Sequence, residues 1–206
     1  MIFFEQKTDQ LATLDFRKLS MILRRKVRCP IVLVGMMASG KSSIGWRLAD
    51  DRYLGLGFFD SDAAVEEEFG QPIKSIYALW GEASFRDAEK IIIERILKNH
   101  PACVLSTGDG SFLNPEIREM IQENAVSIWL HSKADIVFDR VLRRLLKEKN
   151  LQEISQDEED QIRQNLKKIM DERDPIYRHA HIHIESNDDS HDETMRRILL
   201  ALDSYF

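Results

Sequence analysis

The feature that most constrains this chain is the segment IVLVGMMASGKSS at residues 31–43. A short apolar run leads into the pattern Gly-x-x-x-x-Gly-Lys-Ser, and the residues after it favour a helix. Between a buried strand and a helix, the backbone N–H groups of such a loop wrap polyphosphate, and the positive end of the helix dipole strengthens the binding. The segment therefore predicts an α/β fold with a phosphate-binding loop (P-loop) for a nucleoside triphosphate.

Two side chains of the loop are predicted to complete the triphosphate site. Lys41 can bridge the outer phosphates, and the hydroxyl of Ser42 can hold Mg²⁺. An ordinary glycine turn is the alternative, but strand, loop and helix in this order argue against it. The loop alone leaves open what happens to the γ-phosphate.

The composition favours one soluble domain. Of the 206 residues, 43% are hydrophobic and 31% are charged, so the chain can bury one substantial core. A net charge of −6 does not favour a nucleic-acid-binding protein. One basic cluster precedes the first strand of the core, and we interpret it as a solvated helix end: Arg24, Arg25, Lys26 and Arg28.

The cysteines and the apolar runs bear on where the protein works. Cys29 and Cys103 have neither metal-ligand spacing nor the density of a disulfide framework, which fits a reducing cytoplasm. The sequence has no apolar run long enough to cross a membrane, and the N-terminal MIFF is too short for a secretory signal. We expect a cytoplasmic protein with no membrane partner, and a monomer is the default.

Strand and helix patterns alternate along the chain. Strands are predicted at 31–34, 57–59, 102–106, 126–130 and 181–185. Helices are predicted near 41–53, 62–69, 73–79, 84–99, 114–123, 133–149, 157–172 and 190–204. Such alternation implies parallel strands joined by right-handed crossovers, hence a sheet covered on both faces.

Two segments stand apart from this alternation. Residues 1–28 form a predicted N-terminal extension, partly helical, before a single domain at 29–206. Its apolar residues recur at roughly helical spacing, with Thr8 or Asp9 as the expected cap: Leu11, Leu14, Leu19, Ile22 and Leu23. The highly charged stretch 147–172 predicts a mobile helical lid or a solvated helix.

Two carboxylates follow the second strand in the segment FFDSD. Asp60 and Asp62 stand at the carboxyl end of a strand, where open α/β sheets bind ligands. Asp60 is placed to approach the magnesium, directly or through water. Asp62 can orient an attacking hydroxyl or remove its proton. A helix N-cap is the alternative role for this segment, and Asp62 could both cap the helix and act on a ligand.

Other candidates lie further along the chain. Arg86 and Glu89 are three residues apart on a helix, so Glu89 can hold the guanidinium, although a surface ion pair is the simpler interpretation. The glycines around Asp109 allow a close approach to a ligand, and an ordinary turn fits equally well. Pro175 is predicted to end a helix and to fix the direction of Arg173.

Three histidines alternate in the segment HAHIHIE. His179, His181 and His183 would share one face of a strand. A metal site is one interpretation, and a half-exposed edge strand is the favoured one.

Taken in order, five segments resemble the shikimate kinases, small P-loop kinases of the nucleoside monophosphate kinase group. The segments are GMMASGKSSIG, FFDSDAAVEEEFG, GEASFRDAE, VLSTGDGS and RDPIY, within residues 31–186. Many families share the P-loop, whereas the DSD, FR and RxPxY elements in this order are more specific. The resemblance implies a P-loop kinase fold, with a five-stranded parallel sheet sandwiched by helices, a lid at about 143–160 and a substrate-binding helical region.

The resemblance also implies an activity and a set of site residues. ATP would donate its γ-phosphate to the 3-hydroxyl of shikimate, on the pathway to aromatic amino acids, with Mg²⁺ held by Ser42 and Asp60. ATP-binding residues would be Ala38, Ser39, Gly40, Lys41, Ser42 and Ser43, with Arg143 or Arg144 from the lid. Shikimate would be bound by Asp62, Arg86, Gly108, Gly110 and Arg173. The catalytic residues would be Asp62, as the base, together with Lys41 and Arg86. The pair Arg86 and Arg173 suits the carboxylate of shikimate.

Three positions depart from the family pattern. Asp109 replaces the middle of three consecutive glycines, and it would repel an anionic substrate unless it points away or is paired. Residues 142–146, LRRLL, stand where the family lid has Arg-Pro-Leu-Leu. Ala38 replaces a loop glycine, which is a mild change if its φ is negative.

Two alternatives remain open on this reasoning. One is a kinase for another acceptor, such as gluconate or a nucleoside monophosphate, although a nucleotide would require aromatic stacking and more basic residues. The other is a degenerate paralogue that binds ATP without transferring phosphate. A paralogue that had lost the activity would not be expected to keep the whole predicted set of site residues: Lys41, Ser42, Asp60, Asp62, Arg86 and Arg173.

Overall fold

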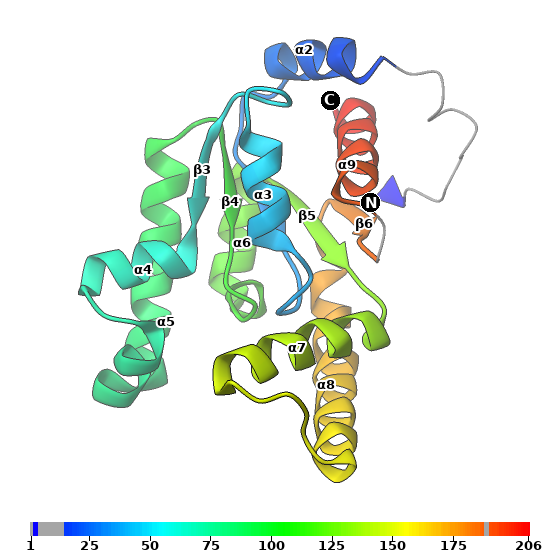
Figure 1. Ribbon diagram of the computed structural model, residues 1–206. Helices are drawn as coiled ribbons and strands as arrows, with labels where there is room; N and C mark the ends of the chain where they lie inside the picture. Colours follow the sequence, from blue (N-terminus) through cyan, green and yellow to red (C-terminus); the bar gives the residue numbers. More distant parts are fainter. Residues whose placement is uncertain (1, 4–14, 188–189) are drawn as a thin grey trace.

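The computed structural model describes residues 2–3, 15–187 and 190–206. Within them, one sheet of parallel strands has the order β1-β6-β5-β2-β4-β3 (Figure 1). The strands are β1 (Ile2–Phe3), β2 (Ile31–Val34), β3 (Gly57–Asp60), β4 (Cys103–Ser106), β5 (Val126–His131) and β6 (Ile182–Glu185). The prediction of five parallel strands is confirmed, each within one residue of its expected bounds, and the short β1 extends the sheet beside β6.

Helices cover both faces of this sheet (Figure 1). They are α2 (Phe16–Lys26), α3 (Lys41–Ala49), α4 (Ser61–Phe69), α5 (Ile73–Asn99), α6 (Pro115–Asn124), α7 (Ala134–Lys149), α8 (Gln156–Tyr177) and α9 (His191–Tyr205), with a 3₁₀ turn, η1 (Ser111–Leu113). In β2, Ile31 and Leu33 belong to one apolar cluster, and Val32 and Val34 belong to the other. A parallel strand buried on both faces is apolar throughout, which explains the run that precedes the P-loop.

Helix α5 joins two predicted helices. The segments 73–79 and 84–99 form one element that is interrupted at Gly81, where φ is 80° and ψ is 169°. Glycine adopts a positive φ at little cost, so the chain bends there and resumes the helix immediately. The predicted break is therefore confined to one residue.

Pro175 does not end α8, contrary to the prediction. The helix continues to Tyr177, and the backbone N–H of Arg178 still donates to the carbonyl of Asp174 at 3.0 Å. A proline removes its own N–H from a helix and crowds the carbonyl four residues earlier, but it leaves the N–H groups that follow it intact, and here it lies within the last turn. Burial of the Tyr177 side chain holds that turn against the core.

Helix α2, from the predicted extension, packs on the core. Asp15 caps the helix by accepting two hydrogen bonds from backbone N–H groups of the first turn. Leu19 and Leu23 are buried in the same apolar cluster as Ile198 of α9. Helix α2 is thus continuous with the hydrophobic core.

The exposed side of α2 carries the basic cluster, as predicted. Its last turn is basic, and Lys26 pairs with Asp203 at 2.9 Å while Arg24 donates to the carbonyl of Tyr53. The remaining predicted features of the extension lie outside the described residues: Thr8, Asp9, Leu11 and Leu14.

The prediction that the histidines lie on an edge strand is wrong. Strand β6 lies between β1 and β5, because Ile2–Phe3 pairs with its first residues. His183 is buried, with Nε2 3.1 Å from two backbone carbonyl oxygens, and His181 Nδ1 lies 2.9 Å from Ser127 Oγ. His179 and His181 precede the strand, so the three side chains do not share a strand face. These contacts give the imidazole rings of His181 and His183 structural roles.

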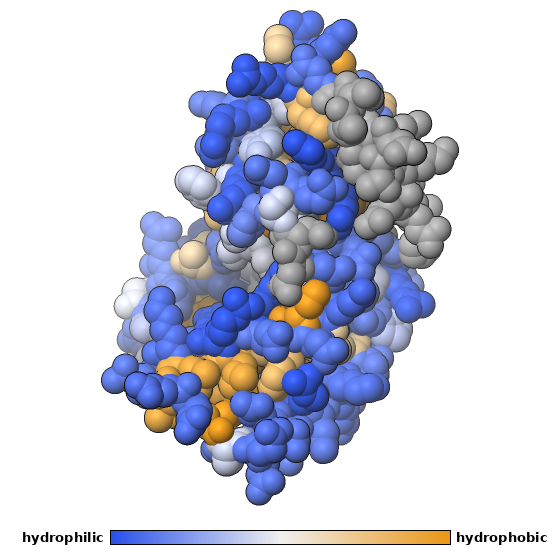
Figure 2. Space-filling model, turned by 45° about the vertical axis from the view of Figure 1, so that its right-hand side comes forward, coloured by the Kyte–Doolittle hydropathy of each residue, from blue (hydrophilic) through white to orange (hydrophobic). Residues whose placement is uncertain are grey.

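The surface in Figure 2 is mainly hydrophilic, with apolar side chains gathered over the end of the molecule formed by α7 and α8. A groove there is lined by Leu145, Ile154 and Ile162, which are only partly buried. The predicted lid, residues 143–160, consists of the end of α7, a short connection and the start of α8. Among the described residues, no helix has the length and apolar character needed to cross a membrane.

We predict that Leu23→Ala lowers the free energy of unfolding by about 2–5 kcal/mol, because it opens a cavity where α2 meets the core. Met21→Ala on the same helix is the matched control, because its side chain is 61% exposed. Chemical denaturation of both variants measures the difference. Equal effects would show that α2 is not integral to the core.

Candidate active site

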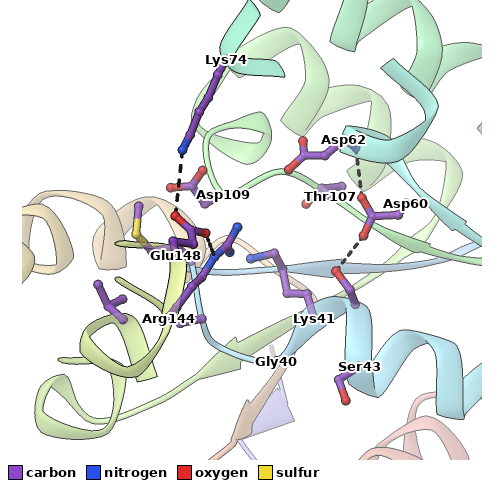
Figure 3. A pocket seen from close by; sticks show the side chains of 14 residues that line it. Gly40, Lys41, Ser43, Asp60, Asp62, Lys74, Thr107, Asp109, Arg144 and Glu148 are labelled. Atoms are coloured by element: carbon purple, nitrogen blue, oxygen red, sulfur yellow. Dashed lines mark hydrogen bonds and ion pairs between the residues drawn. The ribbon is translucent and has the colours of Figure 1, made fainter. Parts of the chain in front are cut away.

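The candidate site lies at the carboxyl ends of three neighbouring strands. The P-loop follows β2, the paired aspartates stand at the end of β3, and a glycine-containing turn follows β4. Together with α7 and Lys74 of α5 they line an open cavity of about 490 Å³ (Figure 3). Its lining residues are Met37, Ala38, Gly40, Lys41, Ser42, Ser43, Asp60, Asp62, Lys74, Thr107, Asp109, Val141, Arg144 and Glu148.

The P-loop depends on glycine where the backbone is crowded. Gly35 has a φ of 137°, and a Cβ there would lie 2.6 Å from the carbonyl oxygen of Leu130. Ala38 has a φ of 59°, so its replacement of glycine is not the mild change expected for a negative φ. An alanine in this region costs on the order of 1 kcal/mol. Arg140 opposes that cost by donating from Nη1 to the Ala38 carbonyl at 3.2 Å.

Lys41 is buried beneath the loop. Its Nζ donates to the carbonyls of Gly35 and Met36, each at 2.8 Å. Burial lowers the pKa of Lys41 to about 8, and nearby carboxylates, Asp109 first among them, partly oppose the shift. The buried hydroxyl of Ser39 has no hydrogen-bond partner among the described residues. The loop therefore presents a cation and an unsatisfied polar atom suited to phosphate.

Asp60 joins β3 to the P-loop helix. Its Oδ2 accepts a hydrogen bond from Ser42 Oγ at 2.7 Å, and its Oδ1 accepts one from the backbone N–H of Asp62 at 3.1 Å (Figure 3). Asp60 is thus the N-cap of α4, and the alternative of Asp62 as the cap is wrong. The side chain of Asp62 is left to line the cavity.

The environment of Asp62 favours its protonated form. Burial, followed by repulsion from Asp60, Glu89 and Asp109, raises the pKa of Asp62 to about 6. Lys41 acts in the opposite direction but does not cancel these effects. A carboxylate with such a pKa is ionised at pH 7 and accepts a proton more readily than an ordinary aspartate.

Arg86 is held in place by a buried carboxylate, that of Glu89. Its Nη1 donates to Glu89 Oε2 at 2.9 Å, and Glu82 on the preceding turn lies 3.3 Å from Nη2. The Glu89 side chain is fully buried, and its other oxygen accepts from Ser111 Oγ at 2.6 Å. The simpler interpretation as a surface ion pair is therefore wrong.

The two glycines after β4 make room for functional side chains. A Cβ on Gly108 would lie 2.6 Å from Asp62 Oδ1, and a Cβ on Gly110 would lie 2.6 Å from Arg86 Nη2. Any larger residue would displace a charged group of the site. The close approach explains both glycines better than an ordinary turn does.

Between these glycines, Asp109 pairs with Arg173 of α8. Arg173 Nη1 donates to Asp109 Oδ2 at 2.6 Å, and the Tyr177 hydroxyl donates to the Asp109 carbonyl. Of the possibilities left open for Asp109, the structure shows the paired one. Asp109 thus contacts Arg173, and the adjacent Gly110 packs against Arg86. These are the two arginines predicted to bind the acceptor.

Arg143 and Arg144 of α7 have different partners and different positions relative to the cavity. Arg143 donates back to the Asp139 carbonyl of its own helix, whereas Arg144 lines the cavity and donates to Glu148 at 2.9 Å (Figure 3). Glu148 also lies 3.9 Å from Lys74 Nζ. Of the two lid candidates, Arg144 is the one placed toward the site.

Sequence reasoning missed Arg140. Its guanidinium reaches both Ala38 and the carbonyl of Asn187, the latter at 2.8 Å, and it lines a smaller cavity of about 170 Å³ beside the P-loop. His191, which contacts Ser43 at 3.2 Å, borders the same cavity. The available signal was helical spacing, because Arg140 and Arg144 are one turn apart.

The fold and the site define a P-loop kinase, with a phosphate loop after β2, a carboxylate pair after β3 and arginines across the cavity. Comparison with known proteins gives the family. A family model described as shikimate kinase matches residues 37–203. The chain therefore belongs to the shikimate kinase family.

Individual relatives agree with this assignment. The shikimate kinase of Novosphingobium aromaticivorans is 38% identical over 88% of this chain and 91% of its own length. That of Caulobacter vibrioides is 41% identical over 84% and 81% of the two chains. A solved shikimate kinase from Acinetobacter baumannii, in complex with shikimate, has a TM-score of 0.73 and 29% identity over 86% of this chain and 94% of its own. A gluconokinase from Sinorhizobium meliloti, at 18% identity and a TM-score of 0.55, shares the fold alone; 87% of this chain and 94% of that chain are covered.

We predict that Asp62→Asn stabilises the protein at pH 7 when magnesium and nucleotide are absent. Because the folded-state pKa of about 6 exceeds the ordinary value of 3.8, the contribution of Asp62 to stability is complete below pH 4 and is lost as the pH rises through 6. The variant should gain on the order of 1–2 kcal/mol at pH 7 and little at pH 4. Denaturation at the two pH values measures this.

The matched control is Asp87→Asn, which removes the same charge from an exposed position on α5. It should follow the wild-type curve. A gain for Asp62→Asn that is the same at both pH values would contradict the electrostatic explanation.

Proposed function

We infer that this chain is a shikimate kinase that transfers the γ-phosphate of ATP to the 3-hydroxyl of shikimate. The product, shikimate 3-phosphate, belongs to aromatic amino acid biosynthesis. Beyond family membership, one observation carries the acceptor assignment. Two guanidinium groups, Arg86 and Arg173, flank the 109–110 segment, while Asp62 and the P-loop line the neighbouring cavity. Such a site suits a small acid that also offers a hydroxyl group.

The donor end has the groups that a nucleoside triphosphate requires. We propose that the phosphates bind residues 38–43. The buried Ser39 hydroxyl, which has no partner among the described residues, would donate to a phosphate oxygen. The Lys41 ammonium would turn from the loop carbonyls to the phosphate oxygens. Arg144 would meet the outer phosphates from α7. The smaller cavity bordered by Arg140 continues from the loop and is the proposed location of the nucleoside.

The contact between Ser42 and Asp60 fits a magnesium ion. Two oxygen atoms 2.7 Å apart, one of them anionic, are ligands that Mg²⁺ accepts when it also keeps water and phosphate oxygens. When bound, the ion would neutralise charge that develops on the transferred phosphate. We therefore propose Ser42 as a direct ligand and Asp60 as a direct or water-mediated one.

Asp62 is the proposed base. Its carboxylate lines the cavity within the field of Lys41, and its raised pKa of about 6 leaves it ionised yet basic at neutral pH. It would orient the 3-hydroxyl of shikimate toward the γ-phosphate and take up the proton as the bond forms. The backbone at Gly108 and Gly110 would contact the rest of the acceptor.

We further propose that the protein is a cytoplasmic monomer that acts on small molecules and not on nucleic acid. The net charge of −6 supports the absence of a nucleic-acid partner. Cys29 and Cys103, both free thiols in the described structure, support a reducing compartment.

We predict that the purified protein with ATP and Mg²⁺ releases ADP in a shikimate-dependent manner. Asp62→Asn should lower kcat by about 10²–10⁴-fold, because it removes the base while keeping the shape; Arg86→Ala should abolish turnover at ordinary shikimate concentrations. Asp87→Asn is the control for a lost surface charge. A coupled ADP assay with shikimate, gluconate and a nucleoside monophosphate distinguishes the alternatives. ATP binding without shikimate-dependent ADP release, or a clear preference for gluconate, would refute the assignment.

The two lid arginines provide an internal comparison. Arg144→Ala should raise the KM for ATP roughly tenfold, the value of one charge-assisted contact to phosphate. Arg143→Ala should leave it near the wild-type value, because Arg143 Nε is engaged by its own helix. The reverse order, measured by the same assay at saturating shikimate, would contradict the proposed direction of Arg144.

A further inference from the structure

We propose that Asp109 is a specificity-determining residue: its carboxylate occupies Arg173 until the carboxylate of the acceptor replaces it. As a result, the site selects less strongly for charged acceptors than the same two arginines would without Asp109. The inference rests on the proposed function, in which Arg173 binds the acceptor carboxylate.

The contact between the two side chains is the first observation. Arg173 Nη1 and Asp109 Oδ2 are 2.6 Å apart, a short charge-assisted hydrogen bond. Arg173 is 25% exposed and Asp109 is 31% exposed, so the pair is neither sealed in the core nor free in solvent. Asp109 also lines the main cavity, from which a ligand would approach. The pair is therefore accessible to exchange.

The backbone around Asp109 is held on both sides. The N–H of Gly108 donates to Ser61 Oγ at 2.9 Å, and the carbonyl of Asp109 accepts from Tyr177. Gly110 is packed against Arg86, with no space even for a Cβ. A ligand can therefore displace the Asp109 carboxylate by side-chain rotation, but the residue itself stays beside Arg173.

The charges at this end of the cavity nearly cancel before a ligand binds. Arg86 pairs with the buried Glu89 and also with the exposed Glu82, and Arg173 is neutralised by Asp109. An incoming carboxylate gains one guanidinium contact but separates another carboxylate from the same guanidinium. The displaced carboxylate remains near the ligand, and like charges at short range repel. The net gain from the acceptor charge is accordingly reduced, whereas contacts to its hydroxyl groups are not.

The test compares shikimate with its uncharged methyl ester, which keeps the reacting hydroxyl. Asp109→Asn preserves the size and the hydrogen bond to Arg173 but removes the charge. We expect the KM for shikimate to fall roughly three- to tenfold while kcat and the KM for the ester change little. The preference for the acid over the ester, expressed as the ratio of kcat/KM values, should rise by the same factor.

Two further variants make the result decisive. Asp109→Gly, which the backbone accommodates without strain, should raise the same ratio and replaces Asp109→Asn if that variant does not fold. Asp174→Asn removes a carboxylate of similar exposure from the neighbouring position on α8 and should leave the ratio unchanged.

The outcomes separate the inference from the proposed function. An active wild-type enzyme whose acid-to-ester ratio is unaffected by either Asp109 variant would overturn the inference alone. A higher KM for shikimate in Asp109→Asn would also overturn it, because Asp109 would then hold Arg173 ready for the substrate. Wild-type protein that shows no shikimate-dependent turnover would overturn the proposed function itself.

Discussion

The site depends on one constraint: three of its positive charges, Lys41, Arg86 and Arg173, are too buried to remain without partners. Lys41 is held by two loop carbonyls, Arg86 by Glu89, and Arg173 by Asp109. Leaving such groups unpaired away from water costs several kcal/mol, so the chain supplies its own acceptors. The proposed anionic ligands would therefore bind by exchanging partners at positions that these internal pairs already fix.

Much of the local sequence around the cavity follows from this pairing. Glu89 belongs to the helix that carries Arg86, three residues away, and Ser111 satisfies its second oxygen inside the protein. Positions 108 and 110 require glycine because charged side chains lie too close for a Cβ. Burial, followed by repulsion from the surrounding carboxylates, raises the pKa of Asp62. The shift suits the proposed role of Asp62 as a base and lowers stability at neutral pH.

The sequence predicted what depends on local pattern and failed where distant contacts decide. The five strands, the P-loop and the closeness of Ser42 and Asp60 follow from apolar runs and from strand ends meeting at one edge of a sheet. Pro175 was predicted to end α8, but burial of Tyr177 outweighs one lost hydrogen bond. The partner of Asp109 lies 64 positions away, and no local spacing could show it.

The same exchange is proposed at the donor end, where Arg144 pairs with Glu148; this pair is more exposed than that of Arg173 with Asp109. A single small anion that reached Arg173 would gain little, because it would replace an equivalent carboxylate already in contact. A ligand gains more when it replaces several partners at once and adds contacts of its own, as a triphosphate or a polyhydroxy acid does. Under the proposed exchange, internal carboxylates would lower affinity for isolated charges while sparing ligands that match the whole site, so discrimination would depend on shape and hydroxyl groups as well as on charge.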